Sequence, residues 1–150
     1  MTTRRGFLAS LLAASALPSL SWADAGSPAY LAAAKLADGT FALHGLTAHG
    51  VSVFAIPLPA RGHAATAHPT RPEAVAFARR PGVYAIILDC VNGVVITRLA
   101  PPEGTQFNGH GTFSQDGEIL YTSEVIGTTS EGRIGLWDAA NGYRRNWRGP

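Results

Sequence analysis

Short apolar runs, rather than the broad stripes of amphipathic helices, make up most of the chain. Runs such as "VYAIIL" at 83–88 are bounded by Gly, Pro, Asn or Asp, which is typical of strands joined by tight turns. Several runs are continuously apolar, and this favours strands that are buried on both faces. Nine strands are predicted in this way: 29–34, 40–46, 51–56, 74–79, 83–88, 94–99, 118–124, 133–137 and 143–147. The pattern therefore predicts an all-β fold.

Two Gly-His pairs predict the innermost strands of a repeat. "GHAATA" begins at Gly62, and "GHGTFS" begins 47 residues later at Gly109. A second element, "DCVNG" at 89–93, returns 49 residues later as "DAANG" at 138–142. Both intervals suit a four-stranded propeller blade, whose repeat is about 40–50 residues long.

The repeated Asp-x-x-Asn-Gly segment is expected to form the turn before the outer strand. Asn-Gly readily takes the positive φ angles of a type I′ hairpin turn. The first unit has Gly50 at the equivalent place, in "LTAHG". The residues to which we assign this structural role are Asp89, Asn92, Gly93, Asp138, Asn141 and Gly142.

The repeat divides the chain into three units, at about residues 28–58, 61–100 and 108–150, and the first lacks its inner strand. Propellers typically have 4–8 blades. Residues 26–150 are therefore predicted to be the N-terminal blades of a seven-bladed propeller, and the chain a truncated product of it. An isolated piece of this kind exposes apolar faces and open strand edges, which favour aggregation.

The N-terminal segment "MTTRRGFLASLLAASALPSLSWADAG" has the features of an export signal. Arg4 and Arg5 form a twin-arginine pair, and the apolar stretch after them is short and interrupted by Pro18, unlike a membrane span. Ala23 and Ala25 predict cleavage after residue 25. The mature protein is therefore expected in the bacterial periplasm; the alternative is a buried N-terminal helix.

Composition supports a folded domain and excludes some functions. The chain is 46% hydrophobic and 15% charged, and its net charge of +2 comes with no basic stripe, so nucleic-acid binding is not indicated. Cys90 is the only cysteine, so an internal disulfide and a cysteine-based metal site are excluded. It is either a small residue beside a turn or a reactive thiol. No nucleophile elbow, phosphate-binding loop or metalloprotease helix occurs, and no cofactor is evident.

The segments at 59–89, 107–124 and 132–145, together with the leader, resemble the bacterial domain of unknown function 1513. The resemblance implies a twin-arginine-exported, periplasmic, propeller-like protein, longer than this chain, that is associated with periplasmic iron-uptake components. A weaker resemblance is to tryptophan-aspartate repeats, because Trp137-Asp138 follows His110 at the interval of that motif. Quinoprotein-like propellers share the same architecture.

His63 and His110 are the main candidate site residues, and two interpretations of them stay open. As the first residues of inner strands, they would point to the same end of the propeller channel, where histidines can bind a metal or an anion. Alternatively, each is a structural peg that hydrogen-bonds to a turn aspartate, Asp89 or Asp138.

Arg79 and Arg80 are candidates for contact with an anion, because two guanidinium groups in one loop can clamp a carboxylate or phosphate. The structural alternative is that Arg79 caps strand carbonyls or pairs with Asp89 or Glu124. His68 is expected on an exposed turn, outside any site.

No acid–base pair is evident among Glu73, Glu118 and Glu124, which are expected at strand ends. The sequence therefore favours a binding or scaffolding protein linked to iron or another metal. The alternatives are a subunit of a quinoprotein-like redox enzyme and an inert truncated product.

Overall fold

The computed structural model describes residues 19–79, 82 and 84–145, and in them it contains strands and no helix. No helix in this part of the chain is long and apolar enough to cross a membrane. The all-β prediction is confirmed. The strands are β1 (Tyr30–Lys35), β2 (Phe41–Leu46), β3 (Ser52–Leu58), β4 (Gly62–Ala67), β5 (Glu73–Ala78), β6 (Ala85–Asp89), β7 (Val94–Leu99), β8 (Thr105–Phe113), β9 (Ile119–Ile126), β10 (Gly132–Asp138) and β11 (Arg144–Arg145).

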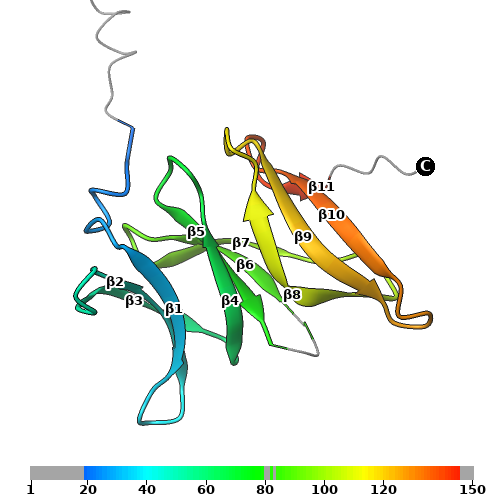
Figure 1. The fold of residues 1–150 in the computed structure, drawn as a ribbon, viewed down its shortest axis with the longest axis horizontal. Coiled ribbons are helices and arrows are strands. Elements are labelled where there is room, and N and C mark those ends of the chain that lie inside the picture. Colours follow the sequence, from blue (N-terminus) through cyan, green and yellow to red (C-terminus); the bar gives the residue numbers. More distant parts are fainter. Residues whose placement is uncertain (1–18, 80–81, 83, 146–150) are drawn as a thin grey trace, which may run out of the picture.

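The strands form three antiparallel sheets that follow one another along the chain (Figure 1). The first sheet contains β1 to β3, the second β4 to β7 and the third β8 to β11, and each strand pairs with its neighbour in sequence. The three sheets cover residues 30–58, 62–99 and 105–145, so the third begins before residue 108. Strand β8 starts at Thr105, and its pairing with β9 shifts register between Phe107 and Gly111.

The first sheet has one strand fewer than the other two. Gly50, Gly93 and Gly142, with φ angles of 78°, 70° and 75°, each lie in the turn before the last strand of a sheet. This equivalence aligns β1 with β5 and β9. The strand absent from the first sheet is therefore the counterpart of β4 and β8, in agreement with the repeat seen in the sequence.

The turn after β6 differs from the type I′ hairpin that we expected. A type I′ turn needs positive φ at both central residues, but at Asn92-Gly93 only the glycine has it. Instead, Asp89 organises a longer turn: its Oδ1 accepts the backbone N–H groups of Val91 and Asn92, and its carbonyl accepts that of Gly93. After β10 the turn is similar: Asp138 Oδ1 accepts the backbone N–H of Asn141, and its carbonyl accepts that of Tyr143. The Asp-x-x-Asn-Gly motif therefore forms the turn, but the hydrogen bonds of the aspartate hold it and the turn is not of type I′.

Strand β6 is buried on both faces, as its continuous apolar run predicted. Ala85, Ile86, Ile87 and Leu88 are all 0% exposed. Ile86 and Leu88 pack with side chains of the first sheet, whereas Ala85 and Ile87 pack with side chains of the third. The second sheet is thus the middle layer of three, and the two apolar interfaces on its faces hold the molecule together.

A buried ion pair lies in the third sheet. The Arg145 guanidinium makes two parallel hydrogen bonds to the Glu124 carboxylate, of 2.7 and 2.8 Å, and lies over the Trp137 ring. Thr122 donates to Glu124 and accepts from the Trp137 indole. Glu124, expected at a strand end, instead lies within β9 and is 2% exposed.

A second polar cluster joins the second and third sheets. Arg71 makes two hydrogen bonds to the Glu73 carboxylate, and it also donates to the backbone carbonyl of Ala139 in the third sheet. The Tyr143 hydroxyl donates to Glu73 over 2.5 Å. These contacts connect residues about 70 positions apart in sequence, so the cluster fixes how the two sheets are placed against each other.

His68 is a buried structural residue, contrary to our expectation of an exposed turn. Its side chain is 1% exposed and packs edge-on against Phe113. Nδ1 accepts the backbone N–H groups of Thr70 and Arg71, and Nε2 lies 3.0 Å from the Gly117 carbonyl. Since Nδ1 is occupied as an acceptor, the ring is neutral and carries its proton on Nε2.

The segment before β1 also packs on the sheets. The Trp22 indole donates to the carbonyl of His68 over 2.8 Å, and Ala25, which is 6% exposed, belongs to the core of the first two sheets.

We predict that His68 makes the protein less stable in mild acid. Burial, followed by the positive charge of Arg71, lowers the pKa of His68. The unfolded chain protonates this residue near its ordinary pKa of about 6.5, and the folded chain does so only at lower pH. The unfolded state thus binds more protons, so the free energy of unfolding falls as the pH drops below that value. Urea denaturation between pH 7.5 and 5 measures the effect, with His68→Gln as the non-titrating control; equal pH dependence in both proteins would contradict it.

Candidate functional site

The two Gly-His histidines meet at the junction of the second and third sheets. Strands β4 and β8 are in contact, although they belong to different sheets. His63 Nε2 lies 3.1 Å from His110 Nε2, and the rings are edge to face with centroids 4.8 Å apart. Both side chains are exposed. The structure thus brings together the two residues that the sequence singled out.

The glycine of each pair makes this approach feasible. Gly109 has a φ angle of +87°, and a Cβ atom built on it would lie 2.6 Å from Cδ2 of His63. A Cβ atom on Gly62 would lie 2.6 Å from the Cβ of Ala33 in the first sheet. Each glycine therefore packs against the preceding sheet, and the histidine after it extends to the surface.

The structure does not show the hydrogen bonds from these histidines to the turn aspartates that the peg interpretation predicts. Asp89 uses its carboxylate oxygens for the backbone of its own turn and for the Asn92 side chain. Asp138 binds Asn141 in the same way. The histidines contact each other and not these aspartates. A histidine that does help to anchor one sheet to the next is His68, through Gly117.

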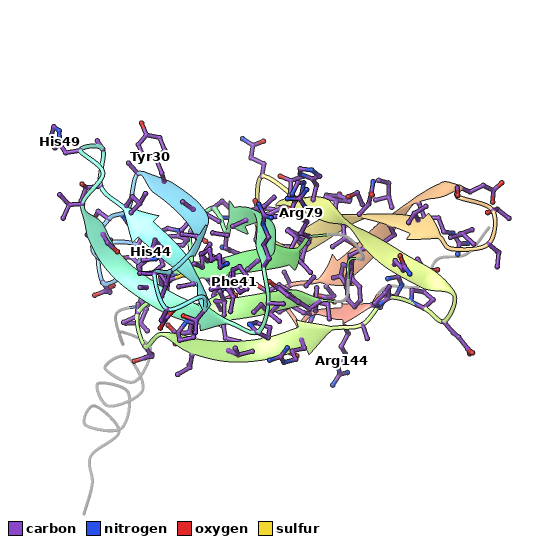
Figure 2. All side chains as sticks on the ribbon, turned by 90° about the horizontal axis from the view of Figure 1, so that it is seen from below. Tyr30, Phe41, His44, His49, Arg79 and Arg144 are labelled. Atoms are coloured by element: carbon purple, nitrogen blue, oxygen red, sulfur yellow. The ribbon has the colours of Figure 1, made fainter. Side chains whose placement is uncertain are left out.

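Arg79 and Asn108 complete the surroundings of the histidine pair. A pocket of about 360 Å³ is lined by His63, Arg79, Asn108 and His110. The Arg79 backbone N–H donates to the Arg61 carbonyl over 3.0 Å, which holds the end of β5 beside the start of β4. Figure 2 shows Arg79 on the upper side of the sheets in that view, opposite Arg144.

The ion pair of Arg79 with Asp89 or Glu124, which was one form of the structural alternative, is not formed. Asp89 is engaged in its turn, and Glu124 is bound by Arg145. Arg80, like Arg4 and Arg5, lies outside the described residues. Capping of strand carbonyls by Arg79 and contact of Arg79 with an anion both stay predictions.

The two histidine Nε2 atoms are hydrogen-bonded to each other over 3.1 Å, and this separation is also compatible with two ligands of one metal ion. Ligands about 2.0–2.1 Å from a metal, at angles between octahedral and tetrahedral values, lie about 2.9–3.4 Å apart, and the observed 3.1 Å falls in that range. In the described part of the chain, no group of three or more His, Cys, Asp or Glu residues could hold a metal ion. The pair thus offers two ligands and leaves the other coordination positions open.

A larger pocket, of about 660 Å³, lies at the start of β8 and the end of β9, but its described lining contains no histidine, lysine or arginine. Its ionisable lining residue is Glu124, whose charge is already balanced by Arg145. Cys90 is also unsuited to chemistry. It is 2% exposed, and burial together with the charge of Asp89 raises the pKa of its thiol to about 12. This supports the interpretation of Cys90 as a small residue beside a turn.

Comparison with known proteins places the chain in a family. Residues 56–148 match DUF1513, a family of proteins of unknown function. The chain belongs to this family. The match includes both Gly-His pairs and the two Asp-x-x-Asn-Gly turns, so the DUF1513 region contains the whole candidate site. No curated protein matches the chain significantly.

We predict that Gly109→Ala destabilises the protein more than Gly93→Ala. Both glycines have positive φ, so either substitution incurs a backbone cost of about 1–2 kcal/mol. A Cβ on Gly93 meets nothing within 4 Å, whereas a Cβ on Gly109 collides with His63. Chemical denaturation should therefore show the larger loss for Gly109→Ala, and His63→Ala in the same chain should recover part of it. Equal losses at the two glycines would contradict the close contact.

Proposed function

We propose that the chain is a metal-binding part of an exported β-propeller, and that it binds a first-row transition metal ion through Nε2 of His63 and His110. The observation that carries the proposal is the 3.1 Å separation of these two exposed nitrogens at the meeting point of two sheets. Imidazole suits zinc, copper, iron and nickel. On this proposal, the protein binds or scaffolds rather than catalyses.

The packing of the sheets supports the propeller. Three up-and-down sheets stack in chain order, with β1 against β4 and β4 against β8. The exposed apolar surface on the outer face of the third sheet is evidence for a further blade that would cover it. Ile134 is 63% exposed there, at the position that corresponds to the fully buried Ala85 in the second sheet. In a WD-like or quinoprotein-like propeller of seven blades, further inner strands would supply the remaining ligands.

Export through the twin-arginine pathway and a periplasmic location are part of the proposal, and they rest on Arg4, Arg5 and the Ala-x-Ala site. Cleavage after Ala25 would remove the contact of Trp22 with His68. The periplasmic iron-uptake components are proposed as partners on the family resemblance.

The redox-enzyme alternative lacks such a supporting observation. The buried carboxylate of Glu124 is bound by Arg145, and that of Glu73 by Arg71 and Tyr143. Glu124 joins β9 to β11 within the third sheet, and Glu73 joins the second sheet to the third, so both carboxylates have structural roles.

We predict that His63→Ala and His110→Ala each weaken metal binding at least tenfold, and that the double variant removes it. Each substitution deletes one of two ligands, and because both side chains are exposed the fold should be retained. Isothermal titration with Zn²⁺ and Cu²⁺ measures the affinity, and thermal melts check the fold.

The matched control is His49→Ala, an exposed histidine in the turn before β3. It should bind both metals as the parent does. The proposal is wrong if the double variant keeps the parent affinity, or if His49→Ala loses as much.

A further inference from the structure

A second pocket adjoins the histidine pair on the side of the first sheet. It has a volume of about 440 Å³ and shares His63 and Arg79 with the pocket between the histidines. Its lining residues come from the first and second sheets: Ala33, Ala34, Lys35, Phe41, Arg61, Gly62, His63 and Arg79. The two pockets are therefore neighbours that have the same two side chains on their border.

Three cationic side chains line the second pocket. Lys35 is the last residue of β1, Arg61 directly precedes β4, and Arg79 directly follows β5. Contact between β1 and β4, together with the hydrogen bond from Arg79 N–H to the Arg61 carbonyl, brings these residues to one place. All three are exposed. We call Lys35, Arg61, Arg79 and His63 the basic trough.

Nothing acidic lines the basic trough. Neither of the two pockets has an Asp or Glu among its described lining residues. The ion pairs of the described part of the chain are formed elsewhere, between Arg71 and Glu73 and between Arg145 and Glu124. Gathering like charges without a counter-charge is unfavourable, and a bound anion removes that cost.

We infer that the basic trough binds the anionic part of a small ligand that has several carboxylate or phosphate oxygens. Guanidinium groups give paired hydrogen bonds to such oxygens, and the lysine ammonium adds a mobile point charge. The inference deepens the proposed function, since His63 borders both pockets and the oxygens of such a ligand can fill the open positions of a metal at the histidine pair.

The test is isothermal titration of the full chain, freed of metal on a chelating resin, with citrate and with inorganic phosphate in separate experiments. The parent should bind at least one of them, more weakly as sodium chloride is added. Lys35→Gln/Arg61→Gln should lose at least tenfold in affinity. The matched control is Arg144→Gln, an exposed arginine on the opposite side of the sheets in Figure 2, which should bind as the parent does.

The arms of the test separate the ligand classes. Binding of citrate alone assigns a polycarboxylate, and binding of phosphate alone assigns a phosphorylated ligand. Failure of both to bind at millimolar concentration overturns the inference, as does parent-like binding by Lys35→Gln/Arg61→Gln or an equal loss in Arg144→Gln.

The same experiment distinguishes this inference from the metal proposal. Lys35→Gln/Arg61→Gln should bind Zn²⁺ like the parent in the absence of citrate and phosphate, because neither residue supplies a ligand to the metal. If anion binding is observed and metal binding is not, the basic trough stands and the metal site falls. If metal binding is observed and anion binding is not, the anion-binding role of the basic trough is rejected and the metal site stands.

Discussion

The close approach of the inner strands β4 and β8 is the contact on which the rest of the structure depends. It leaves no room for a Cβ at Gly109 while the ring of His63 keeps its position. A Cβ at Gly62 likewise has no room where β4 approaches β1. With the strands at this separation, the apolar faces of adjacent sheets meet, and the histidines after the glycines share one end of the interface. The fold and the candidate site therefore have a common cause.

Polar groups at the interface between the second and third sheets fix its geometry. Apolar packing around Phe77 and Phe107 supplies attraction but little direction. Direction comes from His68 bound to Gly117, and from Arg71, which binds Glu73 and the third sheet together. Hydrogen bonds have a preferred direction, which apolar contacts lack. They hold the two sheets in the register that places His63 opposite His110.

The strands and the convergence of the two histidines could be predicted from the sequence, because both follow from local pattern and repeat spacing. Strand β6 shows this well, since a short, unbroken apolar run between turn residues is typical of a strand covered on both faces. Where the prediction of burial failed, side-chain partners distant in sequence were responsible. His68 precedes a proline in a polar turn, yet it is buried by Phe113 and Gly117, more than 40 residues away.

The basic trough was missed for the same reason. Lys35 and Arg61 are isolated charges in the sequence, and they approach Arg79 only because β1, β4 and β5 lie side by side. The predicted type of the Asn-Gly turn was wrong for a different reason. The dipeptide suggested a two-residue hairpin, but the aspartate three residues before Asn92 organises a longer turn. A signal for this was present in the repeated Asp-x-x-Asn-Gly spacing.

The central claim is that two sheets bring two imidazoles to a single binding point. Electron spin-echo envelope modulation of the chain loaded with one equivalent of Cu²⁺ tests it most directly, because the remote nitrogens of coordinated imidazoles can be counted. The account predicts two coordinated imidazoles in the parent and one after His110→Ala. A single imidazole in the parent, or an unchanged count in the variant, would contradict it.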